Sequence, residues 1–188
     1  MNVMPEIAEA HSKLTEWRRD LHRHPELAFE EHRTSAFVAD QLRNFGLHVT
    51  TGIAGTGVVG TLSRGGGNRA IGLRADLDAL PIVEANEFDH VSTTPGVMHA
   101  CGHDGHTIML LGAAEYLANH GQFSGTIHFI FQPAEENEGG ARAMVEAGLF
   151  DQFPCESVYG MHNIPGIEVG AFAIKDGPIM AAFDIFEI

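Results

Sequence analysis

The chain has 188 residues, of which 44% are hydrophobic and 19% are charged, a composition typical of a globular protein. Its 25 acidic residues against 11 Lys and Arg residues give a net charge of −14, which disfavours nucleic acid and anionic membranes as partners. Two cysteines exclude a disulfide framework, and the acidic amino terminus has no apolar secretory segment, so we expect a cytoplasmic protein.

The amino-terminal part predicts two amphipathic helices. Residues 6–22 carry apolar side chains at helical spacing, and the pair His24-Pro25 favours an end to that helix, because a residue before proline avoids the helical region. Residues 34–45 repeat the apolar pattern, and Gly46 is typical of a carboxyl-terminal cap.

The middle of the chain predicts three strands and then a helix. The strands are expected at Leu47–Ile53, Val58–Leu62 and Ala70–Arg74. The turn at 63–68 is long enough to join the last two as an exposed hairpin. After an irregular polar stretch at 84–96, we expect Asp104 to cap a helix with apolar residues at 110–118 on one face.

The last third alternates strands with a helix. In order, the expected elements are a strand at 126–132, a helix at 140–147, and strands at 157–162 and 168–173. The alternation indicates a layered α/β domain with a partly parallel sheet. The final ten residues are apolar and strand-like, and they contain no turn signal, so we expect the chain to stop inside an element.

The densest chemical segment is His99–His106, which contains three His, one Cys and one Asp within eight residues. Cys101 and His103 are separated by one residue, so an extended backbone puts both side chains on the same side, as one metal centre requires. The alternative is a loop before a helix in which His and Asp serve only as caps.

A pair of carboxylates follows the apolar strand expected at 126–132. Glu135 and Glu136 point apart on an extended backbone, so one could bind a metal while the other acts as a base. In α/β folds, sites are built at this end of a strand. The alternative is that the two side chains belong to a solvated acidic surface, where such pairs are common.

Two further strand ends carry candidate residues. His162 follows an apolar run, where either a metal ligand or a capped core histidine would fit. Arg74, Asp76 and Asp78 share one strand face, where they could orient a metal-bound histidine or form a plain ion pair. Strand ends and the loop before the helix converge in α/β domains, so together these residues could supply the ligands and the base of a two-metal site.

Five stretches, in one order along the chain, resemble those of a known family. They are Trp17–Glu26, Leu73–Pro81, Met98–His106, Phe129–Glu136 and Gly160–His162. The family is the amidohydrolase branch of the aminoacylase and carboxypeptidase-type co-catalytic metallopeptidases. That branch includes hippurate hydrolase, N-acyl-amino-acid amidohydrolases and the indole-acetyl-amino-acid hydrolases.

The resemblance implies a role for each matched residue. Glu135 would be the general base and Asp76 would orient His103. Two divalent ions (Zn, Mn, Ni or Co) would be held by Cys101 in the shared position and by His103, Glu136 and His162. The implied reaction is hydrolysis of the amide bond of a small N-acyl amino acid by a metal-activated water.

The resemblance also implies a layered α/β/α catalytic domain with a mixed, mostly parallel sheet, truncated before a lid or dimerisation domain. Residues 1–178 would form the amino-terminal part of that domain, and 179–188 would begin the next. Members of the family are longer and form homodimers, and their later part brings a lid and one further ligand histidine. We therefore expect weak or absent activity from this chain alone.

Two other interpretations stay open from the sequence. One is a catalytically inactive truncated homologue that acts as a metal-binding or interaction module. The other is acyl transfer with Cys101 as the nucleophile and His103 or His106 as its partner. The acyl-transfer interpretation leaves the pair Glu135-Glu136 and His162 without a role.

Overall fold

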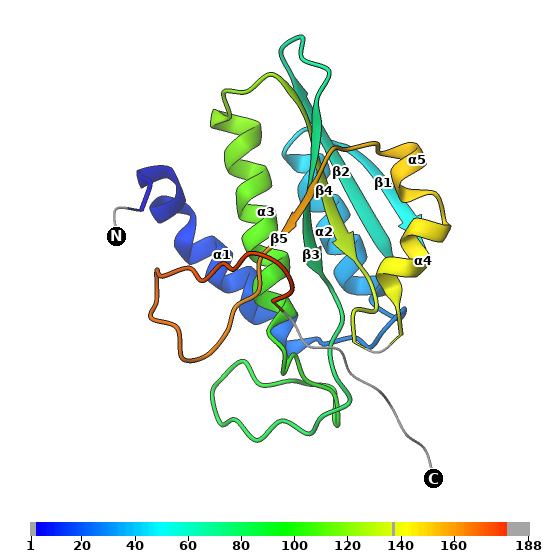
Figure 1. Cartoon of the computed structure of the whole chain (residues 1–188). Helices are drawn as coiled ribbons and strands as arrows, with labels where there is room; N and C mark the ends of the chain where they lie inside the picture. Colours follow the sequence, from blue (N-terminus) through cyan, green and yellow to red (C-terminus); the bar gives the residue numbers. More distant parts are fainter. Residues whose placement is uncertain (1–2, 137, 180–188) are drawn as a thin grey trace.

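The computed structural model describes residues 3–136 and 138–179, in which helices pack against a five-stranded sheet (Figure 1). The helices are α1 (Pro5–Arg23), α2 (His32–Asn44), α3 (His103–His120), α4 (Gly140–Glu146) and α5 (Leu149–Gln152). The strands are β1 (His48–Ile53), β2 (Gly57–Arg64), β3 (Ala70–Asp76), β4 (Gly125–Gln132) and β5 (Val158–Gly160). Within the described ranges, no helix is both long enough and apolar enough to cross a membrane.

The sheet has the order β1-β2-β4-β3-β5. Strand β2 pairs antiparallel with both β1 and β4, whereas β3 pairs parallel with both β4 and β5. The expected α/β class and the mixed sheet are therefore confirmed. Parallel pairings make up two of these four rather than a majority, because β2 runs antiparallel to both of its neighbours, β1 and β4.

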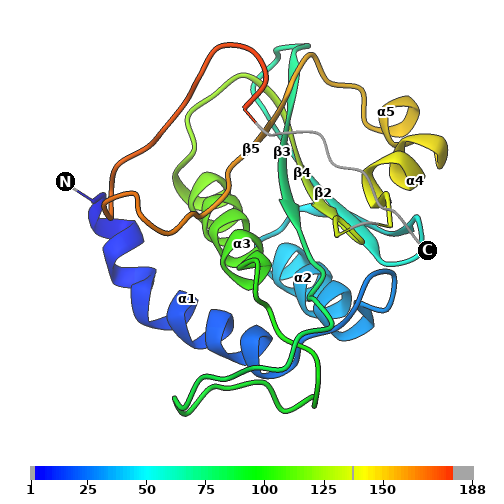
Figure 2. The same ribbon diagram turned by 60° about the horizontal axis from the view of Figure 1, so that its bottom comes forward.

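Helices cover both faces of the sheet, as the α/β/α layering requires (Figures 1 and 2). Alternate side chains of the central strand β4 explain how: Phe129 and Phe131 belong to the core beneath α1, α2 and α3. Ile130, between them in sequence, belongs to a second core with Met144 of α4 and Leu149 of α5. One apolar strand thus serves two cores.

The hairpin expected between the second and third strands is wrong. Strands β2 and β3 are neighbours in sequence, but β4 lies between them and pairs with both. The physical reason is burial: β4 is buried along nearly all of its length and takes the central position, which separates β2 from β3.

Three other expectations need correction or fall outside the described residues. The strand expected at 168–173 does not form: Val169 is fully exposed at 101%, and no neighbouring strand in the described chain pairs with this segment. Asp104 is not the cap of α3, because Gly102 occupies that position with a φ of +83°. Of the apolar end predicted at 179–188, all but Ile179 lies outside the described residues.

Candidate metal centre

The carboxyl ends of three parallel strands and the start of α3 bring the predicted site residues together (Figure 1). Asp76 is the last residue of β3 and pairs in register with Gln132, the last residue of β4. Glu135 and Glu136 follow β4, and His162 follows β5. Because neighbouring parallel strands end at one edge of a sheet, side chains distant in sequence become neighbours there.

His103 lies at the centre of the group and is fully buried. Its Nδ1 is 3.2 Å from Oδ1 of Asp78, and its Nε2 has no hydrogen-bond partner among the described residues. Carboxylate oxygens of Asp76, Glu135 and Glu136 lie 3.7, 3.8 and 3.8 Å from that Nε2.

A buried ring nitrogen without a partner is unfavourable, and three carboxylates around it favour positive charge. Burial by itself lowers the pKa of His103, but the bond to Asp78 and the charge of Asp76 outweigh it and raise that pKa. With Nδ1–H donated to Asp78, the lone pair of Nε2 faces the carboxylates. A divalent cation satisfies both requirements, so these residues fit a metal.

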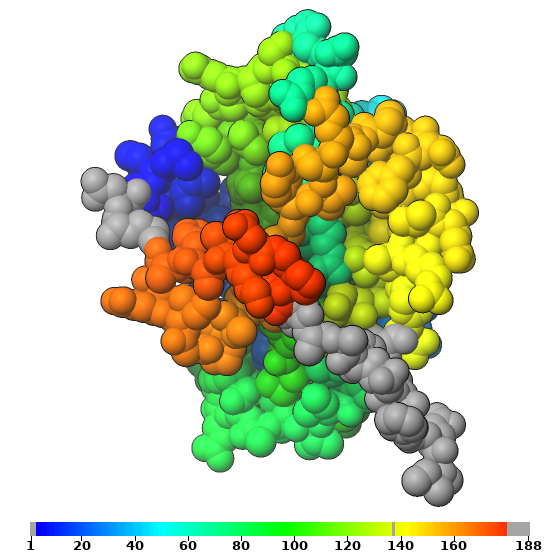
Figure 3. Space-filling view, in the orientation of Figure 1, coloured from blue at the N-terminus to red at the C-terminus, as the bar shows by residue number. Residues whose placement is uncertain are grey.

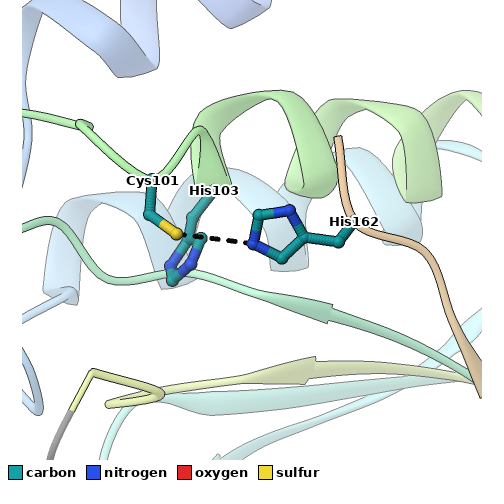
Figure 4. A group of neighbouring side chains, drawn as sticks. All are labelled: Cys101, His103 and His162. Carbon is teal, nitrogen blue, oxygen red and sulfur yellow. Dashed lines mark hydrogen bonds between the residues drawn. The ribbon is translucent and has the colours of Figure 1, made fainter. Parts of the chain in front are cut away.

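Cys101 and His162 form the second part of the group. The Sγ atom of Cys101 is 3.4 Å from Nε2 of His162, and Figure 4 shows both side chains beside the ring of His103. Nδ1 of His162 contacts the backbone oxygen of Asn163, which leaves Nε2 for the site.

The protonation of Cys101 opposes the acyl-transfer interpretation. Burial, followed by the carboxylates of Glu136 and Glu135, raises the pKa of the Cys101 thiol to about 12. A nucleophilic cysteine needs the opposite shift, since the thiolate is the reactive form. A bound cation reverses this balance by stabilising the thiolate as a ligand.

Three overlapping sets of side chains have potential ligand atoms within 4.8 Å of one another. All three contain His103. The sets are Cys101 with His103 and His162, His103 with Glu135 and Glu136, and Asp76 with His103 and His106. The first two sets together contain every predicted ligand and the predicted base.

Glu135 and Glu136 differ in their surroundings. The side chain of Glu135 is 42% exposed, whereas that of Glu136 is 22% exposed and its backbone N–H donates to Oδ2 of Asp78 at 2.9 Å. Burial and the neighbouring charge of Glu136 raise the pKa of Glu135 above its usual range. A carboxylate whose pKa is shifted toward neutrality is suited to general-base work.

Asp76 was expected to orient His103, but the structure gives that hydrogen bond to Asp78. Oδ1 of Asp76 instead lies 2.6 Å from Nδ1 of His106, whose Nε2 accepts the backbone N–H of Asn163. The spacing of two residues predicts that Asp76 and Asp78 lie on one strand face, and it marks both as candidates for orienting a histidine. It did not indicate which imidazole each would contact, because that depends on where α3 packs.

Two further residues of the dense segment are buried and lie outside the three ligand sets. Asp104 accepts from Nε of Arg18 at 3.1 Å and lies 2.9 Å from Nδ1 of His22. His99 is buried, and within residues 3–136 and 138–179 neither of its ring nitrogens has a hydrogen-bond partner. The Trp17–Glu26 stretch therefore includes residues that anchor α1 to the start of α3.

Known proteins resemble this chain in sequence and in fold. The sequence pattern of "Peptidase family M20/M25/M40" matches residues 72–185. The chain is 46% identical over its full length to a hippurate hydrolase of Campylobacter jejuni, of which it covers 49%. It is 45% identical to an N-acyl-L-amino acid amidohydrolase of Geobacillus stearothermophilus, over 97% of this chain and 49% of that protein.

Among solved structures, the fold resembles a Bacillus subtilis protein described as a dinuclear metal binding peptidase from the M20 family. The TM-score is 0.86 and the identity 39%, over 91% of this chain and 48% of the other. The chain thus spans about half the length of the curated relatives it matches.

Proposed function

Because the chain belongs to peptidase family M20/M25/M40, we propose that it carries the metal site of an enzyme that hydrolyses the amide bond of N-acyl amino acids. The two relatives above, a hippurate hydrolase and an N-acyl-L-amino acid amidohydrolase, support this substrate class by their names. The observation that carries the proposal is the buried Nε2 of His103, which has no hydrogen-bond partner in the part of the chain that the structure describes. It faces three carboxylates beside a thiol and a second imidazole.

Two divalent cations would be held in this site. The proposed ligands are Cys101, His103, Glu136 and His162, with Cys101 in the shared position. A thiolate together with imidazoles and carboxylates suits Zn, Mn, Ni or Co. When bound, such ions act as Lewis acids and lower the pKa of water toward neutrality.

The proton transfers are proposed for Glu135. Its Oε2 atom lies 3.8 Å from Nε2 of His103, and its side chain has no hydrogen bond among the described residues. It would take a proton from the attacking water and pass it to the nitrogen of the departing amine. Asp76 would act beside it as a positioning residue, through His106 rather than through His103.

The length of the relatives bears on the whole protein. We propose that residues 1–178 contribute part of a catalytic domain and that 179–188 begin a lid or dimerisation domain, as the resemblance implies. A homodimer and a further ligand histidine belong to the same proposal. Weak or absent turnover by the 188-residue chain alone is then expected, because oxyanion stabilisation by a lid would be missing.

Cobalt binding tests the site. Titration of the purified chain with Co²⁺ is expected to produce a thiolate-to-cobalt absorption band that disappears in Cys101→Ser. Cys155→Ser is the matched control, since Cys155 is the other free cysteine of the chain. Cobalt uptake with the same spectrum in Cys101→Ser would contradict the proposed ligand set.

Hydrolysis of N-acetyl and N-benzoyl amino acids tests the base, in a longer form of the protein that includes the proposed lid. Glu135→Gln is expected to retain cobalt while its turnover falls roughly 100- to 10,000-fold, the usual contribution of a general base. Unchanged turnover in that variant would rule out Glu135. Full cobalt occupancy with no turnover of any N-acyl amino acid in that longer form would favour the non-catalytic module.

A further inference from the structure

Glu31 is a fully buried carboxylate that the proposed reaction does not use. It is the residue just before α2, and it lies beneath the turn that follows β4. Its Oε1 accepts the backbone N–H of Ala134 at 2.8 Å, and its Oε2 accepts the hydroxyl of Thr56. No Lys, Arg or His pairs with Glu31 within the described ranges.

Burying a carboxylate costs desolvation free energy, so the hydrogen-bond donors that face Glu31 indicate why a carboxylate stands there. Burial raises the pKa of Glu31, and an apolar side chain would fill the same interior without desolvating a polar group. An apolar side chain could accept neither the N–H of Ala134 nor the hydroxyl of Thr56, and of these two bonds only the first reaches the turn before Glu135. The choice of carboxylate therefore points to the backbone of Ala134.

Ala134 has an unusual backbone and directly precedes the two glutamates. Its φ of +50° lies in the left-handed region, which is unfavourable for a residue with a Cβ atom. The turn is also held from the other side, because the N–H of Gly140 donates to the oxygen of Ala134 at 2.8 Å. A Cβ atom on Gly140 would come within 1.8 Å of the oxygen of Pro133, so the close approach requires glycine there.

We propose that Glu31 is a positioning residue, whose carboxylate holds the N–H of Ala134 and thereby sets the turn that presents Glu135 and Glu136 to the metal site. The inference rests on the proposed function. A second carboxylate acts in the same way, since Oδ2 of Asp78 accepts the N–H of Glu136 at 2.9 Å. Two buried carboxylates thus fix the backbone on either side of Glu135, while the side chain of Glu135 stays free to react.

Amide NMR spectra and metal affinity of the 188-residue chain test this role. Glu31→Ala is expected to shift the amide signals of 134–136 and to weaken Co²⁺ binding about tenfold, the lower end for residues that orient metal ligands. Glu31→Gln is expected to keep an affinity near that of the wild type, because its amide oxygen accepts the same N–H. Glu30→Gln, at an exposed neighbour, is the control and should change neither signal.

Each outcome decides the inference. Folded Glu31→Ala with unmoved amide signals at 134–136 and wild-type Co²⁺ affinity would overturn it. If Glu31→Ala does not fold, Glu31→Gln provides the test. Replacing a carboxylate by a neutral acceptor must move the amide signal of Ala134 if Glu31 holds that N–H. An unmoved signal would contradict the proposal. If the wild type binds no metal, the proposed function fails. The amide signals of 134–136, recorded without metal, still test whether Glu31 holds the turn.

Discussion

At the scale of single residues, one carboxylate organises two parts of the site. Asp78 bonds Nδ1 of His103 with one oxygen and the N–H of Glu136 with the other. Burial opposes the ionisation of Asp78, but these hydrogen bonds outweigh it, so the pKa of Asp78 lies below its usual range. Asp78 therefore stays charged at neutral pH and fixes which nitrogen of His103 faces the carboxylates.

Replacement of Asp78 tests this arrangement. In Asp78→Asn, one of the two N–H donors faces an amide NH₂ instead of an oxygen, so His103 or Glu136 loses its orientation. We expect metal affinity to fall roughly 10- to 100-fold, measured by competition with a chromophoric chelator. Asp89→Asn, at an exposed position, is the control. Equal affinities in the two variants would contradict the assignment.

His99 makes a separate prediction about acid stability. Burial lowers the pKa of His99 from 6.5 to about 4, so the folded protein keeps this ring neutral. Between those values the unfolded chain binds a proton that the folded chain does not, so stability falls as the pH decreases. The loss reaches about 3 kcal/mol near pH 4.

Urea unfolding with a chelator at pH 7 and pH 4.5 measures this effect. His99→Phe is expected to lose less stability on acidification than the wild type, because it has no proton to take up. His22 is the opposite case. Its hydrogen bonds to Asp104 and Glu84 raise the pKa of His22, so its contribution to stability is present at low pH and is lost as the pH rises. An identical pH dependence in wild type and His99→Phe would refute the prediction.

At the scale of elements, the start of α3 is locked to the loop that follows β5. Nδ2 of Asn163 donates to the oxygen of Gly102 at 3.0 Å, and the N–H of Asn163 donates to Nε2 of His106 at 3.0 Å. His162, next to Asn163, is thereby held against Cys101 at the same helix end. The contact joins two elements that are far apart in the sequence.

Alanine variants at two glycines distinguish the effect of the Asn163 contact on metal binding from the effect of backbone strain. Gly102 and Gly96 have φ values of +83° and +79°. A Cβ atom at Gly102 would lie 2.7 Å from the side chain of Asn163, whereas one at Gly96 would meet nothing described in the structure within 4 Å. In both alanine variants, backbone strain is expected to lower the stability of the folded protein by about 1 kcal/mol. Only Gly102→Ala is expected to displace Asn163 and weaken Co²⁺ binding as well. Equal Co²⁺ affinities in the two variants would contradict this.

At the scale of the whole molecule, the described chain after β5 leaves apolar side chains in solvent. Val169, Phe172 and Ile174 are 101, 78 and 96% exposed. Figure 3 shows the segment, in orange to red, on the surface of the molecule. Several exposed apolar side chains in one short segment favour association with another apolar surface.

The isolated 188-residue chain is therefore expected to self-associate as its concentration rises. Replacing both Phe172 and Ile174 by lysine should reduce the association, because it removes apolar area and adds like charge. Sedimentation velocity over a range of concentrations measures the effect. Identical distributions for the wild type and the double variant would show that this segment does not drive association.

Much of the fold and the residue types of the site were predictable from local patterns. Helical spacing predicted α1 and α2, and the motifs around Cys101 and Glu135 predicted metal-binding chemistry that the geometry supports. The central place of β4 was not predictable, because period-two alternation describes the faces of a strand and says nothing about its neighbours in the sheet.

The sequence by itself determined which side chains could bind metal, since ligand types and short spacings are properties of neighbouring residues. Only the tertiary structure decided how they pair: Asp78 with His103 across 25 positions, Asp76 with His106 across 30, and Glu31 with Ala134 across 103. Such pairings depend on how α2 and α3 pack against the sheet. That packing follows from burial of apolar surface over the whole chain, which no local pattern records.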